Sequence, residues 1–179
     1  NQIMGSGTIL DTARLRYGLS EHFKVAQGNI HAYVFGEHGD TSFIPWTGAY
    51  ISGLSTDEYY EEMKAHGKDV KPLDKEAMLE YVQKSGGKVI AKKGATFYAV
   101  SATVCQLVGL ILAASDSLAT VSSMLHGEYG IEDVCLSTLT LVGPNGTQGK
   151  VQMRMNKEEI ALLKKSADAL KEVIAQIEL

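Results

Sequence analysis

The segment Cys135–Glu159, CLSTLTLVGPNGTQGKVQMRMNKEE, carries the signals that decide the fold class. Its apolar beginning is typical of a β-strand, and Gly143-Pro-Asn-Gly146 is a strong turn signal. In Val151–Met155 apolar and polar residues alternate, as they do in a second strand. Asn156-Lys-Glu-Glu159 is a capping box, which predicts a helix start because its side chains satisfy free backbone amides. Together these signals indicate hairpin strands followed by a helix.

The rest of the chain mixes helical and strand patterns without a regular alternation of the two. Strands or extended segments are expected at residues 30–35, 43–51 and 120–125. Helices are expected over residues 8–18, where Gly18 forms the end, and over 20–28, 56–67, 75–85, 96–117 and 157–177. Gly86-Gly87 is expected to weaken the helix before it, and the apolar helix over 96–117 to be buried on most sides. An α+β fold of antiparallel or mixed sheets packed with long helices is therefore expected, rather than a doubly wound parallel sheet.

The composition is that of a globular protein. The chain has 179 residues, of which 45% are hydrophobic, and its formal net charge is −4. These values suit one domain over residues 1–179. Because there is no basic excess, neither a nucleic acid nor an anionic membrane surface is expected as a partner. The most apolar run, Val104–Ala114, is interrupted by Gln106 and is far shorter than the roughly 20 residues that span a bilayer.

Two cysteines, Cys105 and Cys135, occur without a C-x-x-C motif or a cluster with histidine. A disulfide framework and a structural zinc site are therefore not expected, and a reducing cytoplasm fits this composition. The chain begins without a methionine, and Asn1–Gly7 has the character of a connection. We expect the chain to be part of a longer one.

Charged side chains gather in the first predicted helix. Asp11 and Arg14 are three residues apart and share a helix face. Arg16 is about 200° around the helix axis from Arg14, so the two side chains point in opposite directions. Two guanidinium groups with opposite orientations suit two different anions. A solvated ion pair beside a surface arginine explains the same residues.

A histidine flanked by glycines follows the first predicted strand, in the loop Gly36-Glu-His-Gly-Asp40. Imidazole titrates near neutral pH and is suited to proton transfer, and a carboxylate on one ring nitrogen would fix its tautomer. Asp11 and Asp40 are the candidates for that carboxylate. A polar turn with a hydrogen-bonded His38 is the alternative. The spacing of Glu37, His38 and Asp40 matches no metal motif, so no metal site is expected.

Thr96 and His31 each have a functional and a structural interpretation. Thr96 follows Lys93-Gly-Ala, and it either caps the apolar helix or contacts a ligand. His31 lies seven residues before the loop histidine, and it is either a surface residue of the strand or part of a site. Gly5-Ser-Gly7 does not match a nucleotide-binding loop, since Leu10 stands at the last glycine position and no strand precedes it.

Taken in order, several segments resemble the catalytic half of bacterial NAD-dependent L-lactate dehydrogenases, of the lactate/malate dehydrogenase family. These segments are Gly5–Arg16, Gly36–Asp40, Lys93–Thr96, Gly127–Ile131 and Val142–Ile160. The resemblance covers nearly the whole chain and implies the family's C-terminal domain fold. It also implies interconversion of pyruvate and L-lactate by hydride transfer with NAD, the step by which glycolytic pyruvate is fermented to lactate.

The resemblance implies a role for each matching residue. It makes His38 the acid/base group and Asp11 the carboxylate that stabilises the protonated ring. It makes Arg14 the group that holds the substrate carboxylate with a two-pronged contact. The other implied positions are Thr12, Ala13 and Thr96 for the substrate, and Ser6 and Val100 for the nicotinamide.

Arg16 and His31 match a pair that binds the activator fructose 1,6-bisphosphate at a subunit interface in many bacterial members. The family's subunit contacts lie partly in this half, so the resemblance implies a homodimer or homotetramer of the full-length enzyme. The family's N-terminal dinucleotide-binding half, which holds most of the NAD site, has no counterpart in this sequence, so the chain alone is expected to be inactive. Ser85-Gly86-Gly87 stands where relatives usually carry alanine and tyrosine in a helix that borders the site. The two glycines are expected to loosen that helix and so to broaden the substrate pocket.

Two other functions are compatible with these residues. A malate or branched 2-hydroxy-acid dehydrogenase is one, although Glu37 and the Arg16–His31 pair favour lactate. A non-enzymatic anion-binding or oligomerisation module is the other. A degenerate copy would have no reason to keep the complete set of site residues, namely Asp11, Arg14, His38 and Thr96.

Overall fold

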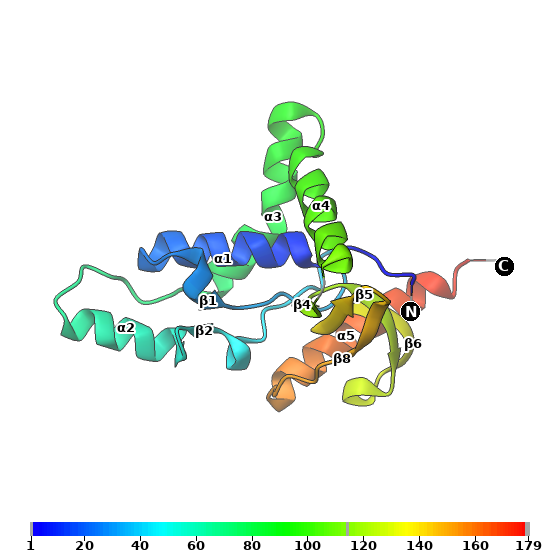
Figure 1. Ribbon diagram of the computed structural model, residues 1–179. Coiled ribbons are helices and arrows are strands. Elements are labelled where there is room, and N and C mark those ends of the chain that lie inside the picture. Colours follow the sequence, from blue (N-terminus) through cyan, green and yellow to red (C-terminus); the bar gives the residue numbers. More distant parts are fainter. Residues whose placement is uncertain (1, 114, 178–179) are drawn as a thin grey trace.

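The computed structural model describes residues 2–113 and 115–177 as helices combined with small sheets (Figure 1). The α-helices of these residues are α1 (Ile9–Phe23), α2 (Thr56–Ala65), α3 (Lys75–Lys93), α4 (Tyr98–Leu112) and α5 (Lys157–Ile174). Short 3-10 turns are formed by Gln27–Asn29, Trp46–Gly48 and Glu128–Gly130.

The strands of the described residues form separate small sheets. One contains β1 (Ile30–His31), β2 (Tyr50–Ile51) and β3 (Leu54–Ser55). A second contains β4 (Ser117–Ala119), β7 (Thr140–Gly143) and β8 (Gly146–Lys150), and a third contains β5 (Ser122–His126) and β6 (Glu132–Ser137). The pairings within these sheets are antiparallel, which confirms the expected α+β class.

A hairpin of two helices projects from the rest of the described structure. In Figure 1, α3 and α4 form this hairpin and α1 crosses its base, while α5 runs along the strands near the C-terminal end. Leu15 and Leu19 of α1 belong to one buried apolar cluster, and Leu163 of α5 belongs to a second with Phe35. The loop that follows Phe35 begins where these two clusters adjoin. The packing of both clusters therefore determines the position of the loop.

Side chains cap the first turns of α3 and α5, and the predicted capping box of α5 is confirmed. Asp74 accepts a hydrogen bond from the Ala77 amide at 2.9 Å at the start of α3. Asn156 and Glu159 form the reciprocal capping box of α5, with bonds of 2.8 and 3.0 Å. The apolar stripe of α5 faces the core as far as Leu170, but its last turn does not, since Ile174 is 49% exposed.

The prediction that Gly18 ends a helix is wrong, because α1 continues through it to Phe23. A Cβ at Gly18 would lie 2.7 Å from the Met78 sulfur and 3.1 Å from the Tyr81 ring. The glycine therefore serves the close approach of α3 to α1, and tertiary packing outweighs its poor helix propensity.

The prediction that α3 ends at Ser85 is also wrong, because the helix runs through Gly86-Gly87 to Lys93. The stop signals lie at its actual end, where Lys92 and Lys93 occupy the last turn and Gly94 has a left-handed φ of 75°. Basic residues in the last turn and a glycine after it are the usual C-terminal pattern, and here they prevail over two interior glycines.

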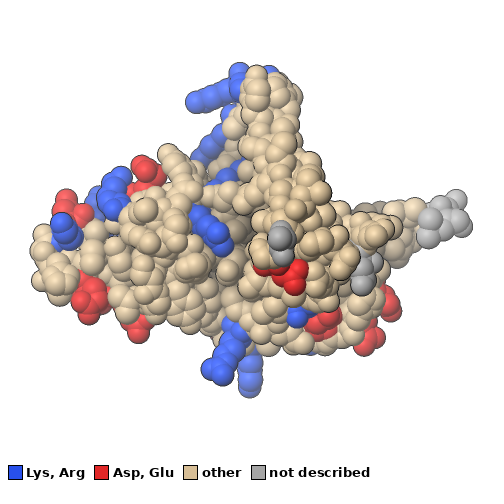
Figure 2. Space-filling view, viewed as in Figure 1, with Lys and Arg blue, Asp and Glu red and all other residues tan. Residues whose placement is uncertain are grey.

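The expected burial of the apolar helix over residues 96–117 does not occur in this chain. The helix is α4, and its buried residues are Thr103 and Leu107, which face the rest of the body. Most of its large apolar side chains are exposed, namely Tyr98, Val100, Val104, Val108 and Leu112. Figure 2 shows the α4 side of the hairpin without charged side chains, because α4 contains none and projects from the body. The apolar sequence of this helix predicts burial on most sides, but only one face of α4 packs against the rest of the structure.

Two strand predictions differ from the structure in extent. Residues 30–35 pair as a strand only at β1, and Phe35 and Gly36 then form isolated bridges to Phe43 and Ser137. The turn at Gly143–Gly146 is so tight that Gly143 pairs with Gly146 directly, so the return strand is β8. Val151–Met155, the predicted strand, therefore lies beyond the hairpin and is not part of a strand.

No helix in the described part of the chain combines the length and the apolarity needed to cross a membrane.

Gly7 has a left-handed backbone conformation and packs closely against the backbone of Thr120 and Ser122. Its φ is +54°, and a Cβ there would lie 2.6 Å from the Ser122 amide nitrogen and 2.8 Å from the Thr120 carbonyl oxygen. Gly53 is the matched control, since its φ is +91° and a Cβ there would meet no atom within 4 Å. In chemical denaturation, Gly7→Ala should lower the free energy of unfolding by about 2 kcal/mol more than Gly53→Ala, because only Gly7 adds a clash with backbone to the conformational cost. Equal losses at the two positions would show that this contact is not tight.

Candidate active site

A hollow of about 410 Å³ lies where α1, the loop at residues 38–42, α3 and the start of α4 meet. Its polar lining includes Asp11, Arg14 and His38, and its apolar lining consists of Leu10, Ile90 and Val100. Four segments that are distant in sequence therefore contribute to one cavity. The hollow contains both candidate motifs of the sequence, the first helix and the glycine-flanked histidine.

The Asp11 carboxylate links the two motifs. Its side chain is 6% exposed, and Asp11 lies in the first turn of α1. One oxygen, Oδ1, accepts a hydrogen bond from Arg14 Nη1 at 2.9 Å, as expected for residues three apart on a helix. The other, Oδ2, lies 2.5 Å from His38 Nδ1. Of the two carboxylates that the sequence offered as partners of the histidine, the structure places Asp11 on the ring.

This contact sets the protonation of His38. A proton on Nδ1 is held by the carboxylate, so Nε2 is the nitrogen left to exchange a proton with a ligand. The hydrogen bond that His38 donates to Asp11 raises the pKa of His38 above its ordinary value of 6.5, and the Asp11 charge adds to this effect. Partial burial and the Arg14 charge act in the opposite direction but do not cancel it. The ring can therefore carry a proton at higher pH than a free imidazole.

Arg14 is positioned to bind an anion in the same hollow. Its side chain is 16% exposed, and Nη1 is the atom bonded to Asp11. Nη2 lies 3.6 Å from the place where a Cβ on Gly86 would stand, so the guanidinium lies against the bare backbone of α3. A guanidinium presents paired donors that match a carboxylate, a geometry that lysine cannot reproduce.

Helix α5 holds the loop that carries His38. The fully buried Ser166 accepts a hydrogen bond from the Glu37 amide at 2.8 Å, and its Oγ is 2.9 Å from Thr41 Oγ1. Thr41 also donates to Glu37 Oε1 at 2.6 Å. Gly36 makes room for this arrangement, because its φ is +97° and a Cβ there would lie 2.7 Å from Ser166 Oγ.

Helix α3 holds the other side of the loop through Gln83. The Gln83 amide nitrogen donates to the Asp40 carbonyl at 3.2 Å and to the Ser42 carbonyl at 3.0 Å. Sequence reasoning did not find Gln83 or Ser166. Ser166 had a detectable signal, since it is a polar residue in the apolar stripe of α5 beside Ala167, whereas Gln83 had none.

Thr96 and Val100 both line the hollow, as the sequence reasoning required of residues near a substrate and a cofactor. The alternative that Thr96 caps the apolar helix does not apply, because the N-cap of α4 is Phe97 and it makes no side-chain cap bond. Ser6 is half-buried and is not among the lining residues of this hollow.

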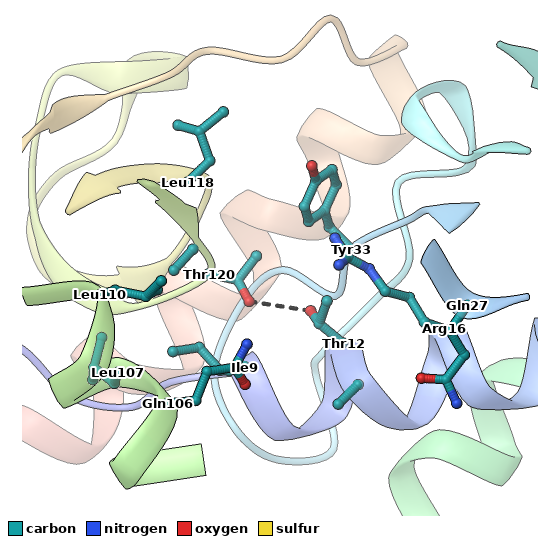
Figure 3. A pocket seen from close by; sticks show the side chains of 12 residues that line it. Ile9, Thr12, Arg16, Gln27, Tyr33, Gln106, Leu107, Leu110, Leu118 and Thr120 are labelled. Atoms are coloured by element: carbon teal, nitrogen blue, oxygen red, sulfur yellow. Dashed lines mark hydrogen bonds between the residues drawn. The ribbon is translucent and has the colours of Figure 1, made fainter. Parts of the chain in front are cut away.

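Thr12 and Ala13 face away from the hollow. Thr12 is buried, and its Oγ1 accepts a hydrogen bond from the Val34 amide at 3.0 Å and lies 3.1 Å from Thr120 Oγ1. Both residues line a second pocket of about 240 Å³ on the other side of α1 (Figure 3). Their side chains therefore do not reach the cavity of His38, because successive residues of a helix point about 100° apart.

Arg16 lines this second pocket, so the opposite orientation of the two arginines is observed. Figure 3 shows Arg16 beside Tyr33, whose ring centroid lies 5.1 Å from the guanidinium carbon. Arg16 Nε also donates to the Ala32 carbonyl at 3.1 Å. His31 is exposed on β1 and is not among the residues that line the pocket. Arg16 and His31 therefore do not meet in this pocket within the described part of one copy of the chain.

Residues 8–178 match the family model for the lactate/malate dehydrogenase alpha/beta C-terminal domain. The chain is 44% identical to the L-lactate dehydrogenase of Acetivibrio thermocellus over 179 residues, which are 100% of this chain and 56% of that protein. It is 42% identical to L-lactate dehydrogenase 1 of Clostridium acetobutylicum, covering 99% of this chain and 56% of that one. The chain thus spans about half the length of the relatives it matches.

Solved structures of L-lactate dehydrogenases share the fold of this chain. An L-lactate dehydrogenase from Clostridium thermocellum superposes with a TM-score of 0.87 at 34% identity, covering 99% of this chain and 56% of that one. The minor L-lactate dehydrogenase of Enterococcus mundtii superposes with a TM-score of 0.89 at 29% identity, covering 99% and 55% of the two chains.

The Asp11–His38 contact predicts a specific dependence on pH. NMR titration of the ring should give a pKa above 6.5 in the wild type and a lower one in Asp11→Asn, because the hydrogen bond that favours the protonated ring is weakened. A pKa raised by folding stabilises the protein fully below the ordinary pKa, and this stabilisation is lost as pH rises through the raised value. The stability advantage of the wild type over Asp11→Asn should therefore shrink above pH 6.5. Asp40→Asn is the control and should leave the ring titration unchanged. A His38 pKa unaffected by Asp11→Asn would contradict the pairing.

Proposed function

This chain belongs to the lactate/malate dehydrogenase family as its alpha/beta C-terminal domain, and we propose that it is the substrate-binding half of an NAD-dependent L-lactate dehydrogenase. One observation carries the proposal: a single buried carboxylate, Asp11, holds an acid/base imidazole and a guanidinium in one cavity. A 2-oxo acid has a carboxylate and a reactive carbonyl on adjacent carbons, so it needs an anion-binding group beside a proton donor.

In the proposed reaction Arg14 binds the carboxylate of pyruvate through two parallel hydrogen bonds. The protonated His38 points Nε2 at the carbonyl oxygen and donates its proton there as the carbonyl is reduced. Asp11 stabilises the imidazolium before transfer and holds the ring in place afterwards, when Nε2 is an acceptor. In lactate oxidation the neutral ring removes the hydroxyl proton at the same nitrogen. The nicotinamide group, when bound, supplies or accepts the hydride.

The apolar part of the hollow suits a planar aromatic ring, which supports the cofactor assignment. Leu10, Ile90 and Val100 contribute that lining beside the polar residues. We assign Val100 to the nicotinamide contact and Ser6 to its edge, outside the hollow of this chain. NAD is held mainly by a domain beyond this chain, so the chain on its own does not turn over.

The α3 residues that line the hollow affect the size of the 2-oxo acid that fits there. Gly86 and Gly87 both line it, and a Cβ on Gly87 would meet no atom within 4 Å. The substrate's small side chain lies near Thr96, and the two glycines leave room for groups larger than a methyl. Pyruvate is the proposed substrate, and malate and branched 2-hydroxy acids are the alternatives. A non-enzymatic module would not need the Asp11 link between two reactive groups.

A second proposed site concerns regulation by fructose 1,6-bisphosphate. Arg16 presents a cation at the second pocket, whereas His31 lies exposed outside it. We assign the two residues to one activator site that is completed between two subunits, which agrees with a homodimer or homotetramer. The cysteines Cys105 and Cys135 are exposed free thiols, which supports placement in the reducing cytoplasm.

The catalytic proposal is tested by steady-state kinetics of the full-length protein. Arg14→Lys should raise the KM for pyruvate at least tenfold, because a charge-assisted hydrogen bond contributes about 1.5–3 kcal/mol. Arg154→Lys, at an exposed position, is the matched control and should leave KM unchanged. His38→Asn should abolish turnover while nucleotide binding persists. An unchanged KM in Arg14→Lys would remove this residue from the substrate site.

The regulatory proposal is tested with the exposed histidine, whose replacement should not disturb packing. In His31→Ala, activity with fructose 1,6-bisphosphate should be about the same as activity without it, since one of the side chains that bind the phosphate groups is lost. His66→Ala, another exposed histidine, should retain the stimulation. Full activation of His31→Ala, or no activation of the wild type, would contradict the site.

A further inference from the structure

A second group of reactive side chains lies outside the catalytic hollow, in a cavity of about 460 Å³ bordered by β5, β6, β7 and β8. Lys150 of β8 reaches into it, and the exposed thiol of Cys135 from β6 shares its lining. The titratable groups His126 and Glu128 face the same space. The proposed dehydrogenase reaction uses none of these residues.

Among the residues that the structure describes, the amine of Lys150 is held only by neutral oxygen atoms. Its Nζ donates to Ser123 Oγ at 2.6 Å and to Thr140 Oγ1 at 3.1 Å, and it lies 3.4 Å from the Ser123 carbonyl. In the described part of the chain, Lys150 forms no ion pair with a carboxylate. A half-buried ammonium without a counter-ion has lost hydration without full compensation, so the neutral amine gains in relative stability.

The environment of Lys150 therefore favours a nucleophilic amine. Burial lowers the pKa of Lys150 to about 8, although the charges of Glu128 and Cys135 act in the opposite direction. An ordinary exposed lysine has a pKa of about 10.4 and is almost entirely protonated at neutral pH. At neutral pH Lys150 thus presents a free lone pair far more often than a surface lysine, and it does so inside a cavity large enough for a small reagent.

We propose that Lys150 is an acyl-acceptor site, at which the cavity between the two sheets admits a small activated acyl group from an acyl phosphate or an acyl thioester. In this step the Nζ lone pair forms a bond to the acyl carbon. The bond from that carbon to the phosphate oxygen, or to the thioester sulfur, breaks and the leaving group takes the electron pair. Nζ releases a proton to solvent, and the product is a neutral amide.

The buried, neutral surroundings of Nζ also determine which class of reagent suits Lys150. An imine formed with an aldehyde or ketone carries a positive charge when protonated. The described residues place only neutral oxygen atoms within hydrogen-bond distance of Nζ to hold that charge. An amide removes the charge. The Ser123 hydroxyl, which accepts from the ammonium, can instead donate to the carbonyl oxygen of the new amide, because a hydroxyl serves in both roles.

The test compares lysines within one wild-type, full-length protein, so it does not depend on a variant that folds. The protein is treated with acetyl phosphate in one arm and acetyl-coenzyme A in the other, from pH 6.5 to 9.5. Acetylation of each lysine is followed over time by peptide mass spectrometry. The exposed Lys68 is the internal control.

At pH 7, Lys150 should be acetylated at least about tenfold faster than Lys68, because a larger fraction of its amine is neutral. Its rate should level off above about pH 8, whereas the rate at Lys68 should continue to rise. Reaction in either arm supports the site and identifies the donor class. The absence of label at Lys150 in both arms, or the same rate and pH profile at the two lysines, would overturn the proposal.

Discussion

The Asp11 carboxylate is the constraint on which the site depends. It is buried in the first turn of α1, where the free amides of a helix N-terminus favour a negative charge, and it bonds to Arg14 and His38 at once. A buried carboxylate with two cationic or ionisable partners cannot release one of them without leaving part of its charge unpaired. The imidazole and the guanidinium are therefore fixed relative to each other, although they come from segments 24 residues apart.

Helix α1 separates the molecule into two faces with different uses. One face presents Arg14 to the catalytic hollow, and the other presents Arg16 to the pocket beside Tyr33. Thr12 belongs to the second face, where hydrogen bonds tie it to Val34 and Thr120, and it does not line the hollow of His38. The resemblance to a family assigns such residues to the same substrate. Helical periodicity, however, decides which of their side chains can contact the same ligand.

Local signals were sufficient for several element boundaries and for the pairing of Asp11 with Arg14. The capping residues Asp74 and Asn156, the tight turn at Gly143–Gly146 and the i,i+3 spacing of Asp11 and Arg14 act over a few residues, and the structure contains each of them. Contacts between distant segments were not predictable in this way. Ser166 and Gln83, the packing role of Gly18, and the exposure of α4 all depend on which element becomes a neighbour.

The central claim is that one hollow binds a small acid between a guanidinium and an acid/base imidazole. The most direct measurement is a crystal structure of the full-length protein with oxamate, an unreactive isostere of pyruvate. The account predicts the oxamate carboxylate in a two-pronged contact with Arg14 and its amide carbonyl oxygen within hydrogen-bond distance of His38 Nε2. Oxamate bound elsewhere, or bound in this hollow without contact to either side chain, would contradict the account.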